Sequence, residues 1–184
     1  MKLNKKGFSK LETLIVIVIV SVLLLLGIVL VSTSTKNKKI DTFKTDSVNI
    51  IKVSQNIYGN LEKVNSEYIV PSNEGISNGM CITLEGLKAN DYLEKEYKDW
   101  EGYIVIEKDL NNKMYYTAWL SNGKYTVVGY SLDKINKLNL KDETLIEGNN
   151  INIPKDTFKG TDKDKGGLSK ITTYNQKCIN EKIE

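Results

Sequence analysis

The chain has 184 residues with 26 basic and 23 acidic side chains, a formal net charge of +3 and no histidine, and every basic residue is lysine. The excess charge comes from Lys2, Lys5, Lys6 and Lys10, less Glu12, so residues 36–184 are neutral and attract nucleic acid poorly. The absence of histidine excludes histidine-based catalysis and metal sites, and we predict neither an enzyme, nor a cofactor, nor a specific nucleic-acid partner.

Residues 13–35 form an uncharged run of 23 residues rich in leucine, isoleucine and valine. As a helix this run would span about 34 Å, against about 30 Å for a bilayer core. The apolar region of a secretory signal peptide is shorter, at about 7–15 residues. The run therefore predicts a retained membrane helix.

The orientation of this helix follows from the length of its flanks. Lysines stand on both sides of the run, so the positive-inside rule decides little. Only about a dozen residues precede the run, whereas residues 36–184 follow it and contain both cysteines. Cysteine pairs suit an oxidising compartment, so we expect a single-pass protein with its body outside the membrane.

Glu12 stands directly before the apolar run. A carboxylate at the edge of a membrane helix is costly and indicates a functional site, the alternative being a side chain that reaches the headgroups. The neighbouring sequence is a short basic leader ending in Gly7, then Phe8, with Glu12 fifth when Phe8 is counted first. This register resembles the N-terminus of type IV prepilins and their pseudopilin relatives.

The resemblance implies how the N-terminus is processed and used. A prepilin peptidase would cut between Gly7 and Phe8, removing the leader 1–7, and the new amine of Phe8 would be N-methylated. Residues 8–35 would then be the transmembrane and assembly helix, in which Glu12 pairs with the Phe8 amine of a neighbouring subunit. The implied partners are other pilin subunits, the peptidase and the assembly platform in the membrane.

Residues 36–64 change from uniformly apolar to amphipathic. Apolar or small residues recur every three or four positions, which indicates one helical face. This face consists of Ile40, Phe43, Ile50 or Ile51, Ser54, Ile57, Leu61 and Val64. We predict that one long helix continues from the membrane under a globular head, the alternative being a break at residues 32–35 followed by a separate helix.

Residues 65–184 are predicted to form the head. Residues 65–88 favour a loop with a short helix near 84–89, and strands are expected at 103–106, 114–120 and 125–130. Asn111–Asn112 predicts a turn, and Asn122–Gly123 a type I′ hairpin turn. This antiparallel meander needs an apolar cover, which the helix supplies. The expected fold is α+β and pilin-like, with its aromatic residues used for packing rather than for a ligand site.

The C-terminal part, residues 131–184, holds weaker signals. Strand candidates lie at 144–146, 151–153 and 168–173, and the resemblance implies a variable, exposed region. Asp162 and Asp164 open a D-x-D-x-G pattern, but position 12 of a calcium loop would be Thr173 rather than glutamate. A solvated turn is favoured, with Asp162 and Asp164 as a weak metal candidate.

Cys81 and Cys178 are the two cysteines. Their spacing alone leaves open a bridge or two free thiols, because it does not establish proximity. The resemblance favours a disulfide, since many pilins tether a C-terminal region in this way.

The function expected from these features is that of a structural subunit of a type IV pilus, a minor pilin displayed on the cell surface. One alternative is a pseudopilin of a type II secretion or DNA-uptake machine. Another, from a different class, is a membrane-anchored extracytoplasmic binding module in which the register of Gly7, Phe8 and Glu12 is coincidental.

Overall fold

The computed structural model describes residues 38–72, 77–138, 146–147, 151–160 and 172–183. Gly7, Phe8, Glu12 and the predicted membrane helix lie outside these residues, as do Asp162 and Asp164. Among the described residues no helix has the length and apolar character needed to cross a membrane.

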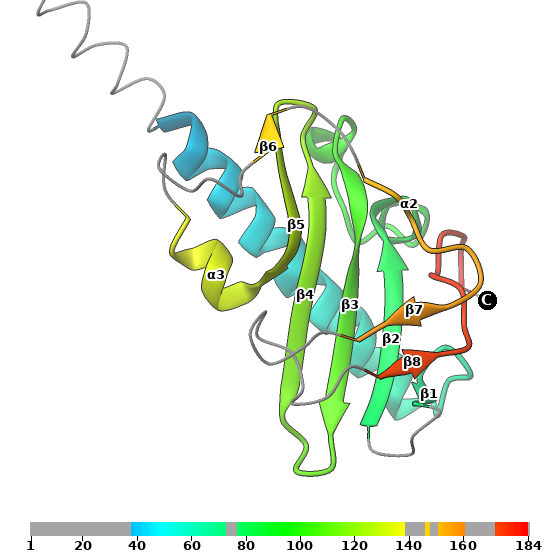
Figure 1. Ribbon diagram of the computed structural model, residues 1–184. Helices are drawn as coiled ribbons and strands as arrows, with labels where there is room; N and C mark the ends of the chain where they lie inside the picture. The colour runs from blue at the N-terminus through cyan, green and yellow to red at the C-terminus, as the bar shows by residue number, and fades with distance from the viewer. Residues whose placement is uncertain (1–37, 73–76, 139–145, 148–150, 161–171, 184) are drawn as a thin grey trace, which may run out of the picture. The chain divides into compact units, whose positions relative to one another are not determined.

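A helix occupies residues 38–63 and lies along one face of the sheet (Figure 1). Its buried side contains Phe43, Ile50, Ser54 and Ile57, as the spacing predicted. The hydroxyl of Ser54 donates to the carbonyl of Ile51 at 2.7 Å. Val64 was expected on this side but is 72% exposed, so that expectation was wrong. The helix ends at residue 63, and the chain turns away there.

The main sheet is antiparallel with six strands in the order β1-β2-β3-β4-β5-β6. The strands are β1 (Val70–Pro71), β2 (Ser77–Thr83), β3 (Glu101–Asp109), β4 (Met114–Ser121), β5 (Tyr125–Ser131) and β6 (Ile146–Glu147). The three strands expected from the sequence are β3, β4 and β5, and they pair as a meander. The α+β class with an antiparallel sheet is therefore confirmed.

Strand β2 was missed, because residues 65–88 were predicted as a loop. It pairs with β3 along its whole length, from Ser77 opposite Asp109 to Thr83 opposite Tyr103. Gly79 in β2 packs under the ring of Tyr174, where a side chain would overlap that ring. Such tertiary packing overrides the turn preference of glycine-containing sequences.

Short helices follow two of the strands. Helix α2 (Leu84–Ala89) begins where expected, with the Thr83 hydroxyl accepting a hydrogen bond from the amide of Gly86 at 2.9 Å. The others are the 3₁₀ helix η1 (Lys95–Tyr97) and α3 (Leu132–Asn136).

The turn at Asn122–Gly123 differs from the predicted type I′ geometry. That type needs positive φ at both central residues, but only Gly123 has it, at 79°. The Asn122 side-chain oxygen instead accepts hydrogen bonds from the amides of Lys124 and Tyr125, at 3.1 and 2.9 Å. The side chain thus stabilises the turn without a second left-handed residue.

The second face of the sheet is also covered. Strands β7 (Phe158–Lys159) and β8 (Thr173–Tyr174) form a separate antiparallel pair in front of β2 and β3 in Figure 1. Phe158 and Tyr174 stack at 4.7 Å and pack with Tyr103 and Val105 of β3. The implication that the C-terminal part is an exposed region was therefore wrong for these residues.

The C-terminal strand candidates had mixed outcomes. The candidate at 151–153 was wrong, because those residues form no strand. The candidate at 144–146 overlaps β6 only at Ile146, and that at 168–173 overlaps β8 at Thr173. The remaining residues of these two candidates, except Thr172, lie outside the described residues.

Candidate functional site at the C-terminal segment

A disulfide joins Cys81 in β2 to Cys178 across a sequence separation of 97 residues. The two Cα atoms are 4.4 Å apart, and both cysteines are buried. The alternative of two free thiols is therefore wrong. The bridge brings the end of the chain against a strand in the middle of the sequence.

Residues 178–183, which begin at the bridging Cys178, are called the C-terminal segment below. Ile179 pairs in parallel with Ile82 of β2. Its amide donates to the carbonyl of Cys81 at 2.8 Å, and its carbonyl accepts from the amide of Thr83 at 2.9 Å and from the hydroxyl of Thr83 at 3.1 Å. The segment thus forms a single parallel bridge at the edge of β2.

Gly86 of helix α2 and Asn90, which caps its C-terminus, contact the C-terminal segment. Gly86 lies against the carbonyl of Ile179, where a Cβ atom would overlap backbone. The Asn90 amide group donates to the carbonyl of Glu181 at 2.9 Å, and its side-chain oxygen accepts from the amide of Ile183 at 2.8 Å. One side chain therefore holds the backbone of the C-terminal segment at two positions.

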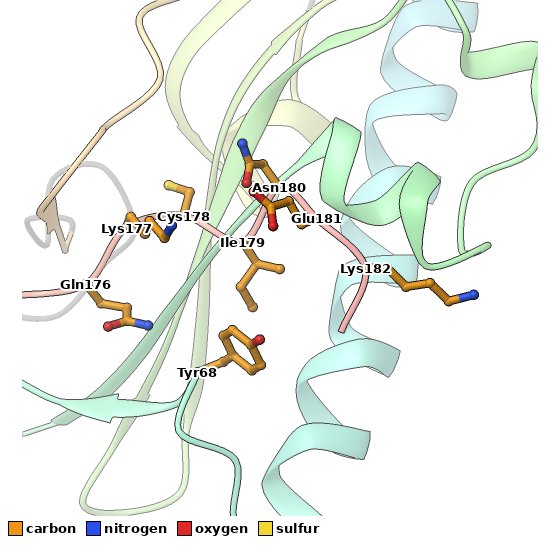
Figure 2. Close-up of a pocket in the computed structure, with 8 residues that line it drawn as sticks. All are labelled: Tyr68, Gln176, Lys177, Cys178, Ile179, Asn180, Glu181 and Lys182. Carbon is orange, nitrogen blue, oxygen red and sulfur yellow. The ribbon is translucent and has the colours of Figure 1, made fainter. Parts of the chain in front are cut away.

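A hollow of about 130 Å³ lies on one side of the segment (Figure 2). Tyr68 and the side chain of Ile179 face each other in it, and both belong to the cluster that packs on the helix side of the sheet. The other lining residues are Gln176, Lys177, Cys178, Asn180, Glu181 and Lys182. Its size is below the roughly 300–1,000 Å³ of typical small-molecule sites.

A second hollow, of about 320 Å³, lies next to the same segment. It is lined by Ile153, Pro154 and Lys155 together with Thr83 and residues of the segment. Ile151, two residues before Ile153, packs with the cluster that contains both cysteines and covers the second face of the sheet. The two hollows thus flank the C-terminal segment.

Glu107 of β3 is a buried carboxylate on the second face of the sheet. It accepts hydrogen bonds from the hydroxyls of Thr172 and Tyr174, each at 3.0 Å. Gly160 lies so close to this carboxylate that a Cβ atom would overlap it. Because buried polar groups need hydrogen-bond partners, Glu107 attaches Thr172 and Tyr174 to the sheet.

The described residues contain no group of three or more acidic or cysteine side chains placed to hold a metal ion. Burial raises the pKa of Tyr103 to about 12. Burial, and after it the negative field of Glu62, also raises the pKa of Tyr58 above its ordinary value. Both phenols therefore remain neutral, and Tyr103 stacks on Trp119 at 4.6 Å, as packing aromatics do.

Of the predicted site residues, Cys81 and Cys178 are the two within the described part of the chain, and the structure brings them together. Gly7, Phe8 and Glu12, and the weak metal candidates Asp162 and Asp164, lie outside the described residues. Sequence reasoning missed Gly86 and Asn90. Asn90 follows a predicted helix, as helix-capping residues do, but nothing in the sequence indicated that it holds a segment some 90 residues away.

Comparison with protein-family models, with curated proteins and with solved structures finds no match to this chain.

Proposed function

We propose that this protein is a structural subunit of a type IV pilus, a minor pilin rather than the main subunit. The observation that carries the proposal is the register of Gly7, Phe8 and Glu12 against an uncharged run of 23 residues. In this proposal the chain is cut after Gly7 and held in the membrane by residues 8–35. It is then incorporated into a filament through contacts between its apolar helix and those of neighbouring subunits.

Glu12 sets the register of assembly in this account. A carboxylate among bundled apolar helices needs a cation, because an unpaired buried charge costs several kcal/mol. The amine of Phe8 on a neighbouring subunit supplies that cation after cleavage. The pair thus favours the incorporation of cleaved subunits whose helices are in the correct axial register with their neighbours.

The head supports this proposal in two ways. A helix at residues 38–63 packs on an antiparallel sheet, which suits a head carried on a helical stem. The disulfide between Cys81 and Cys178 favours an oxidising, extracytoplasmic location for the head.

Mass analysis of the N-terminal peptide from cell-associated protein tests the proposal. We expect a mature chain that begins at N-methylated Phe8. Gly7→Val should leave the chain uncut, because the bulkier residue crowds the scissile bond. Gly27→Val, a matched change inside the apolar run, should leave cleavage intact.

An intact Met1 in the native protein would instead favour a membrane-anchored binding module. Cleavage of the Gly7→Val chain at the same position as the native chain would also contradict the predicted recognition of Gly7.

A further inference from the structure

The C-terminal segment forms an open strand edge. The amide and carbonyl of Ile179 both bond to β2, so the backbone groups of the next residue, Asn180, point away from β2. Asn180 is exposed, and its backbone makes no hydrogen bond within the described part of the chain. Exposed strand groups of this kind are a template for pairing with another chain.

The two hollows flank this edge. The hollow with Tyr68 lies toward the helix side of the sheet, and that with Ile153 and Pro154 toward the second face. Alternate side chains of a strand point to opposite faces, so a strand added beside Asn180 would direct successive side chains toward the two hollows. The smaller hollow, at about 130 Å³, is of the order of the ~150 Å³ cavity that accepts one benzene ring.

The charges around the hollows indicate what kind of strand fits. Lys155, Lys177 and Lys182 are exposed there, against one acidic residue, Glu181. Each hollow combines lysine with apolar side chains: Lys155 and Lys177 with Ile153 and Pro154 in the larger, and Lys177 and Lys182 with Tyr68 and Ile179 in the smaller. An extended occupant that carries both apolar and acidic side chains would complement both hollows.

We propose that the C-terminal segment is a docking edge for an extended, acidic segment of a partner protein. The partner strand pairs with the backbone of Asn180, places apolar side chains against Tyr68 and Ile179, and places carboxylates near Lys155 and Lys177. This proposal does not depend on assembly into a pilus.

Synthetic peptides test the chemistry of the occupant on the full-length chain in detergent. The probe is an eight-residue peptide of alternating valine and glutamate with blocked ends, and its binding is measured by fluorescence anisotropy. We expect binding with added hydrogen-exchange protection at the Asn180 amide. A valine–lysine peptide, and a valine–glutamate peptide N-methylated on its bonding amides, should each bind at least about tenfold more weakly.

Variants at Asn180 test the edge itself. Asn180→Pro removes the outward amide and should weaken peptide binding about tenfold or more, whereas Asn180→Ala keeps the amide and should bind like the native chain. Exchange protection at the Ile179 amide reports whether the segment remains docked. If Asn180→Pro releases the C-terminal segment from β2, the comparison of the native and N-methylated peptides on the native chain tests strand pairing instead.

Two results would overturn the proposal. The first is no measurable binding of the valine–glutamate peptide. The second is equal binding of the native and N-methylated peptides, because strand pairing requires backbone donors.

Discussion

At the scale of single residues, two glycines have opposite roles. Gly86 faces the carbonyl of Ile179 and has no room for a Cβ atom, whereas a Cβ atom at Gly59, in the helix at residues 38–63, would meet no atom within 4 Å. The same substitution therefore has opposite expected effects at the two sites. At Gly86 a methyl group would overlap backbone, whereas at Gly59 it would only increase helix propensity.

Gly86→Ala should lower the free energy of unfolding by about 1–3 kcal/mol, because backbone must move to admit the methyl group. Gly59→Ala should raise it by up to about 1 kcal/mol, because alanine favours the helix. Urea unfolding in detergent measures both. Hydrogen exchange of the Thr83 amide, which bonds to Ile179, should accelerate only in Gly86→Ala; unchanged exchange there would contradict the docking role of Gly86.

At the scale of elements, the helix at residues 38–63 is held to the sheet by its aromatic contact. Phe43 is fully buried, stacks on Trp100 at 5.1 Å and meets Tyr125 edge-on at 5.8 Å. Trp100 immediately precedes β3 and Tyr125 begins β5, so one side chain joins the helix to two parts of the sheet.

Phe43→Ala should lower the free energy of unfolding of the head by about 3–5 kcal/mol, through lost burial and the cavity left behind. Lys52→Ala, on the exposed side of the same helix, should change it by less than about 0.5 kcal/mol. Urea titration followed by tryptophan fluorescence compares them. Equal midpoints for the two variants would show that the helix does not depend on this contact.

Local sequence patterns predicted some helices and strands and missed others. The three-strand meander and helix α2 were predictable because β-branched and aromatic runs, and a capping threonine, are local signals. Strand β2 was not predictable, because its Ser-Asn-Gly start reads as a turn and its strand state depends on pairing with β3. Val64 continued the apolar spacing, but periodicity cannot locate the end of a helix to one residue.

The candidate site was predictable only in part. The pair Cys81 and Cys178 was expected from the resemblance, and the structure joins them. The bridge at Ile179 and the contacts of the C-terminal segment with Gly86 and Asn90 depend on approaches between residues more than 90 positions apart. No local pattern encodes such contacts.

At the scale of the whole molecule, the disulfide closes most of the head into one loop. Removing it with Cys81→Ala and Cys178→Ala together should lower the free energy of unfolding by about 4–5 kcal/mol in the chain-entropy model, given a separation of 97 residues. Urea unfolding with and without reductant measures this. Reductant should have no effect on the double variant, and a loss below about 1 kcal/mol would contradict a stabilising role.

Entry of the protein into a filament depends on Glu12 in the proposed function. We propose that Glu12 pairs with the Phe8 amine of a neighbouring subunit, so its loss should impair assembly and leave the head folded. Glu67→Ala is a suitable control, because Glu67 is an exposed acid in the head.

The most direct measurement is the fraction of each variant recovered in sheared surface filaments, relative to its amount in the membrane. We expect Glu12→Ala to be cleaved and present in the membrane but depleted at least about tenfold from filaments, with Glu67→Ala incorporated like the native chain. Incorporation of Glu12→Ala at the native level would contradict the account.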